Sequence, residues 1–153
     1  MLKKLLPAFC AAALAAGCAS TTSNGPAAAD PLAGQQAAKL ADRSFMWTGG
    51  TSEDCELPPS IRFGADGSIS GQAGCNRMLG AWKQDGKSVD LGQIATTMRM
   101  CAPAFMEVER KFLGFLGETK YITAAAEGEG IVLWNEKGEK VVELVPERAG
   151  KCD

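Results

Sequence analysis

The chain has 153 residues, with 16 lysines and arginines against 18 aspartates and glutamates, and a formal net charge of −2. It contains no histidine, which excludes hydrolases that use an imidazole as general base and zinc sites with histidine ligands. The slightly acidic balance, together with the absence of long Lys or Arg runs, also argues against nucleic acid as a partner.

The N-terminus has the pattern of a bacterial secretion signal. Lys3 and Lys4 precede an apolar stretch over residues 5–16, which is too short for a permanent membrane span. Small residues then precede Cys18, and this resembles a bacterial lipobox, in which such a cysteine is lipidated and becomes the mature N-terminus. We therefore expect residues 1–17 to be a lipoprotein signal peptide and Cys18 to carry the lipid. Cleavage by an ordinary signal peptidase is the alternative.

The next segment has the composition of a flexible tether. Residues 19–39 are mostly Ala, Ser, Thr, Gly, Pro and Gln, without an aromatic residue, so they bury too little apolar surface to offset the entropy cost of ordering. We expect a lipidated N-terminus and tether over residues 18–39 and one folded domain over residues 40–153. By resemblance to other lipoproteins, Ala19 favours the outer membrane, with the domain on its periplasmic face.

The folded region alternates short apolar runs with turn signals, from residues 44–48 to residues 141–145. Asp-Gly pairs at residues 66–67 and 85–86 lie between such runs and predict two hairpins. Residues 94–100 alternate with period two, which predicts a strand with one face toward the core. The residues on that face are Ile94, Thr96, Met98 and Met100.

One segment has the pattern of an amphipathic helix that begins at Pro103 and ends near Gly117. Its apolar residues recur at spacings of three and four: Phe105, Val108, Phe112, Phe115 and Leu116. Charged residues are expected on the opposite side: Glu107, Glu109, Arg110 and Lys111. We therefore expect a mainly β fold, a small antiparallel β-barrel of about eight strands in a lipocalin-like meander, with this helix packed on it.

Two motifs then carry a family resemblance. Gly74-Cys75-Asn76-Arg77 is followed by Ile94-Ala95-Thr96-Thr97-Met98-Arg99-Met100-Cys101-Ala102-Pro103 and the amphipathic helix. Together they resemble the META domain of the HslJ heat-shock lipoprotein family, over about residues 45–145. The resemblance implies a small antiparallel barrel with one helix in an envelope lipoprotein, and a link to heat or antibiotic stress. It carries over no catalytic residue.

Four further cysteines lie in an expected oxidising compartment, at Cys55, Cys75, Cys101 and Cys152. Three pairings of them are possible. The two motif cysteines, Cys75 and Cys101, are favoured as one disulfide, which leaves Cys55 with Cys152. A thiol-redox role is the alternative, although no pair has the Cys-x-x-Cys spacing that tunes such chemistry.

Three polar residues are candidates for binding. Asn76 and Arg77 follow Cys75 in a Gly-rich loop, and Arg99 lies in the second motif. An exposed arginine there can contact an anionic ligand or partner, whereas Asn76 also suits the geometry of a turn.

The sulfur-rich second motif has the residue types of a site for a soft metal ion. Met98, Met100 and Met106 with Cys101 offer soft ligands for Cu(I). Methionines that fill space on the core face of a strand are the favoured interpretation, and we expect neither a metal nor a cofactor.

The sequence therefore predicts a monomeric envelope lipoprotein, held at the membrane by its lipid, that is not an enzyme. It would act in envelope stress or antibiotic tolerance by binding an unknown protein or small molecule. The alternative is a periplasmic inhibitor of a lysozyme or protease. A barrel that carries an apolar ligand is disfavoured, because Trp47, Trp82 and Trp134 can fill the interior.

Overall fold

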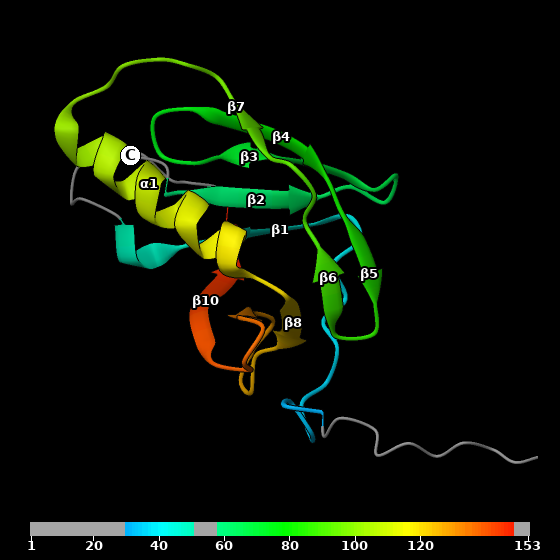
Figure 1. Cartoon of the computed structure of the whole chain (residues 1–153). Helices are drawn as coiled ribbons and strands as arrows, with labels where there is room; N and C mark the ends of the chain where they lie inside the picture. The colour runs from blue at the N-terminus through cyan, green and yellow to red at the C-terminus, as the bar shows by residue number, and fades with distance from the viewer. Residues whose placement is uncertain (1–29, 51–57, 149–153) are drawn as a thin grey trace, which may run out of the picture.

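The computed structural model describes residues 30–50 and 58–148. Within these ranges the chain forms ten short strands, a 3-10 helix η1 (Thr48–Gly50) and an α-helix α1 (Pro103–Glu118) (Figure 1). The strands are β1 (Arg43–Met46), β2 (Ser60–Phe63), β3 (Ser68–Gln72), β4 (Arg77–Ala81), β5 (Lys83–Asp85), β6 (Ser88–Asp90), β7 (Ala95–Thr96), β8 (Tyr121–Ala124), β9 (Ile131–Trp134) and β10 (Lys140–Pro146).

The strands form one antiparallel sheet that curls around the core. Neighbouring strands follow the order β5-β6-β8-β9-β10-β1-β2-β3-β4-β7. Only Trp82 separates β4 from β5 along the chain, so two strands that lie near opposite ends of this order are consecutive in the sequence. The predicted mainly β fold with one packed helix is confirmed. The strands number ten rather than about eight.

Both predicted Asp-Gly hairpins are present. Gly67, between β2 and β3, has φ of 82°, and Gly86, between β5 and β6, has φ of 59°. Glycine adopts these positive φ values without the steric cost that a Cβ imposes. In the first hairpin the Asp66 carboxylate accepts a hydrogen bond from the Ser68 amide at 2.9 Å, which fixes the turn.

Helix α1 covers one face of the curled sheet (Figure 1) and completes the core. Phe112 and Leu116 are buried beneath it, and Trp47 stacks on Phe112 with ring centroids 6.5 Å apart. The helix begins at Pro103, as predicted, and ends at Glu118, one residue after Gly117. Among the described residues, no helix is long and apolar enough to cross a membrane. The largest fully buried apolar side chains are Phe45, Phe63, Phe112, Leu40, Ile61, Ile69, Met78, Ile122, Ile131, Leu133 and Leu144.

The packed structure begins inside the tether predicted over residues 18–39. Leu32 and Ala38 are buried, the backbone at Ala37 bridges to Thr123, and Asp30 forms an ion pair with Lys87. The composition of this segment predicts a tether, because a few small apolar residues bury little apolar surface. They are held here because the backbone of β8 forms hydrogen bonds with this segment, from the Ala38 amide to the Ile122 carbonyl and from the Ala124 amide to the Gln36 carbonyl.

Candidate functional site

The two sequence motifs meet at one end of the sheet. The first forms the turn between β3 and β4, residues 73–76, which is closed by a hydrogen bond from the Ala73 amide to the Asn76 carbonyl at 2.8 Å. The second leads from β7 into α1, and we call residues 97–102 of it the exposed segment. This segment contains neither a turn nor a bend.

A buried carboxylate from α1 holds the turn. Glu109 is 7% exposed and accepts hydrogen bonds from the backbone amides of Cys75, at 3.1 Å, and Asn76, at 2.7 Å. Its second oxygen accepts from Nδ2 of Asn76 at 2.9 Å. Three donors converge on one carboxylate, and hydrogen bonds to an ionised acceptor are stronger than neutral ones. The turn is therefore tied to the helix.

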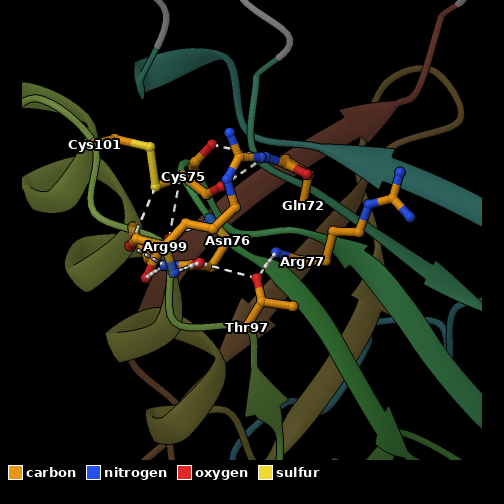
Figure 2. Close-up of a disulfide and its surroundings, with 9 residues drawn as sticks. Gln72, Cys75, Asn76, Arg77, Thr97, Arg99 and Cys101 are labelled. Atoms are coloured by element: carbon orange, nitrogen blue, oxygen red, sulfur yellow. Dashed lines mark hydrogen bonds between the residues drawn. A yellow bond between two sulfur atoms is a disulfide. The ribbon is translucent and has the colours of Figure 1, made fainter.

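The Asn76 side chain passes this restraint on to the exposed segment (Figure 2). Its Oδ1 accepts from the Arg99 amide at 2.6 Å and from the Thr97 hydroxyl at 2.9 Å. Its Nδ2 also donates to the Arg99 carbonyl at 3.2 Å. One buried amide thus fixes both backbone groups of Arg99.

A disulfide joins the same two segments next to this amide. Cys75 and Cys101 are bonded, with their Cα atoms 5.9 Å apart, so the favoured pairing of the motif cysteines is present. Gly74 allows the turn to lie close to α1, because a Cβ there would lie 3.0 Å from the Glu109 amide nitrogen at a φ of 149°. The exposed segment is therefore held by a covalent bond at Cys101 and by hydrogen bonds at Arg99.

The methionines of the exposed segment face solvent. Met98 is 99% and Met100 89% exposed, so the prediction that they fill space in the core is wrong. Strand β7 covers only Ala95 and Thr96, which pair with β4, and the period-two pattern continues past the end of the paired strand. Two large apolar side chains consequently project from a segment whose backbone is fixed.

The predicted binding residues differ in their surroundings. Asn76 is buried, and its polar side-chain atoms all take part in the hydrogen bonds described above, so its evident role is to position the segment. Arg77 and Arg99 are exposed, and the Arg77 side chain extends away from the disulfide (Figure 2). Binding by these arginines stays a prediction. Cys18, Cys55 and Cys152 lie outside the described residues.

The predicted exposure of Glu109 is wrong, because Glu109 is buried on α1. It was expected on the solvent side of the helix with Glu107, but it faces the turn. Its spacing was a usable signal, because Glu109 follows Phe105 by four positions and precedes Phe112 by three, so all three share one face.

A second surface feature is an open groove of about 670 Å³. It lies between β6, the connection that follows β6 and the C-terminal half of α1, and it mixes apolar with charged side chains. None of the predicted site residues lines it. In the described part of the chain, no cluster of three or more Cys, Asp or Glu side chains is arranged to hold a metal ion. The candidate site is therefore the exposed segment with Arg77 beside it.

Comparison with known proteins agrees with this fold. A family profile described as META domain matches residues 39–147. An NMR structure of a protein from Burkholderia xenovorans is similar, with 21% identity and a TM-score of 0.56 over 72% of this chain and 85% of that one. A second NMR structure has 25% identity and a TM-score of 0.50, over 69% and 90% of the two chains. No curated protein matches the chain.

Proposed function

The chain belongs to the META domain family, and we propose that it is a lipid-anchored, non-catalytic binding protein of the bacterial cell envelope. In this proposal Cys18 carries the lipid at the periplasmic face of the outer membrane. The domain then supports envelope integrity under heat or antibiotic stress by binding a protein or a small molecule.

The observation that carries the proposal is the rigidly held exposed segment. Leaving two methionines in water forgoes roughly 1.5–3 kcal/mol of burial free energy each. Methionine and arginine are also enriched at the centres of protein interfaces, and here Arg99 lies between Met98 and Met100, with Arg77 on the neighbouring strand. A fixed backbone lowers the entropy cost of binding. These features favour a protein partner.

The position of the segment fits an anchored protein. The connection from β7 to α1 and the start of the described chain at residue 30 lie at opposite ends of the molecule (Figure 1). If the lipid is attached upstream at Cys18, the exposed segment lies at the end of the domain opposite residue 30, where a partner can reach it.

Photo-crosslinking tests the binding role. A photoreactive phenylalanine analogue replaces Met98 or Met100 in the full chain, which is expressed in the envelope of its own bacterium, and the same analogue at exposed Lys137 is the control. We expect a discrete higher-mass adduct from the two methionine positions and none from Lys137. Identical patterns at all three positions would contradict the proposal.

Intact mass tests the anchor. Protein purified from bacterial membranes should carry acyl chains on Cys18, and at least the Cys75 and Cys101 thiols should become alkylatable only after reduction. An unmodified soluble chain would contradict anchoring but would leave the binding test valid.

The second candidate function is inhibition of a lysozyme or a protease. The same segment favours it, because an inhibitor of this kind inserts a rigid, protruding part of its chain into the cleft of the enzyme.

A further inference from the structure

We propose that the exposed segment, residues 97–102, is a substrate-like inhibitory loop for serine endopeptidases with an apolar primary-specificity pocket, and that Met100 enters that pocket. The inference rests on the proposed binding role of this segment and names the class of partner. It is carried by two observations. Exposed and hydrogen-bonded residues alternate along the segment, and restraints at Arg99 and at Cys101 lie on either side of Met100.

Serine endopeptidases bind their substrates as extended strands that pair with the main chain of the enzyme, as in other cases of strand addition. We call the residue whose side chain enters the primary-specificity pocket the primary residue. In such a strand the backbone groups of the primary residue and of the residue two places before it pair with the enzyme. The backbone groups of the residue between them point away from the enzyme. A segment that acts in this way needs its own internal restraints on the intervening residue.

The exposed segment meets this requirement. Arg99 has its amide and its carbonyl bonded to Asn76. Within the described residues, no hydrogen bond is formed by the amides of Met98 and Met100, and both side chains are almost fully exposed. This alternation makes Met100 the primary residue, with Met98 two places before it and the backbone groups of Arg99 directed toward Asn76.

A protease that binds Met100 in its primary pocket would attack the peptide bond between Met100 and Cys101. Hydrolysis of this bond adds one water, leaving a carboxylate on Met100 and an amine on Cys101. Cys101 would remain attached to Cys75 by the disulfide, and Arg99 would remain bonded to the adjacent Asn76. Both new ends would stay in place at a high effective concentration, so resynthesis competes with release. This property separates an inhibitor from a substrate.

The side chain of Met100 sets the specificity. Methionine is unbranched and apolar, and it suits the hydrophobic slot of chymotrypsin rather than the aspartate-containing pocket of trypsin. Arg99 is a poor primary residue for trypsin because its backbone groups are occupied. We therefore expect inhibition of chymotrypsin and subtilisin, but not of trypsin.

The test is a titration of each of these three enzymes with the disulfide-bonded full chain. The wild type should inhibit chymotrypsin and subtilisin with a dissociation constant below about 1 μM and leave trypsin active. Met100→Asp should weaken inhibition about 100-fold or more, the scale of a buried interface anchor. Met100→Arg should transfer inhibition to trypsin. Leu79→Asp removes an exposed apolar side chain on β4, outside the segment, and serves as the matched control that should change little.

Each contrary result overturns the proposal. These are the absence of inhibition by the wild type, rapid cleavage after Met100 without inhibition, and an equal loss of inhibition in Met100→Asp and Leu79→Asp. If the proteases are unaffected but photo-crosslinking at Met98 or Met100 captures a partner, the binding function stands and the inhibitory loop is refuted. If both fail, the segment is not a binding surface.

Discussion

Glu109 is the residue on which the geometry of the exposed segment depends. Its carboxylate accepts from two backbone amides and from the Asn76 side chain, which in turn fixes Arg99. A substitution of Glu109 therefore affects the exposed segment indirectly, through Asn76.

Glu109→Gln should lower the free energy of unfolding by about 2–3 kcal/mol. Glutamine offers one acceptor oxygen in place of two, so its NH₂ group would face a buried donor. Urea denaturation of the folded chain measures the change. Glu107→Gln is the control, because Glu107 is exposed and forms an ion pair with Lys111 across one helical turn; a surface pair of this kind contributes about 0.5 kcal/mol or less. Equal small changes in both variants would contradict the structural role of Glu109.

Asp30 gives a pH-dependent prediction at the same scale. A hydrogen bond from Lys87, and next one from the Leu32 amide, holds the pKa of the Asp30 carboxyl below its ordinary value of 3.8. Because the pKa is lower in the folded state, the stability from this group is complete above its unfolded pKa. It is lost as the pH falls through the lowered folded value.

Carboxyl chemical shifts followed by NMR against pH should show an Asp30 midpoint below 3.8. Lys87→Met should raise this midpoint toward 3.8, because it removes the larger of the two hydrogen bonds. An Asp30 midpoint that is unchanged in Lys87→Met would show that the ion pair between Asp30 and Lys87 is not maintained in solution.

At the scale of elements, local patterns predicted the hairpins and the helix, because each depends on residues close in sequence. Asp-Gly turns and the spacing of Phe105, Phe112 and Leu116 are signals of this kind. The surroundings of Glu109 and Met98 could not be predicted in this way. The partners of Glu109 lie 33 and 34 residues away in the sequence. The exposure of Met98 depends on where β7 stops pairing with β4, and the periodicity of the segment gives no information about that point.

The disulfide connects the turn after β3 with the segment before α1, so its removal should act on both elements. In the chain-entropy account, the sequence separation of 26 between Cys75 and Cys101 corresponds to about 3.5 kcal/mol as an upper figure. Chemical denaturation of the Cys75→Ser/Cys101→Ser double variant should show a loss of up to this size. A variant as stable as the wild type would contradict the role of this bond.

At the scale of the whole molecule, α1 completes a core that the curled sheet leaves uncovered. Phe112 is fully buried and stacks on Trp47, which links the helix to the end of β1. The same helix carries Glu109, so the packing of the core also sets the position of the exposed segment.

Phe112→Ala should cost about 3–5 kcal/mol, from lost burial and the cavity that it leaves. Arg110→Ala, on the exposed side of the same helix, should change stability by about 0.5 kcal/mol or less. Thermal and urea unfolding of the two variants measure this difference. If Phe112→Ala were tolerated as well as Arg110→Ala, α1 would not be an integral layer of the fold.

The account as a whole depends on the exposed segment being held rigid while its methionines face solvent. Backbone ¹⁵N relaxation of the disulfide-bonded protein measures this directly at residues 98–101. We predict order parameters near 0.85, the value of a rigid backbone, equal to those of β3 and β4. Values below about 0.6 at these residues would show a flexible loop and would contradict both the preorganised binding surface and the inhibitory role.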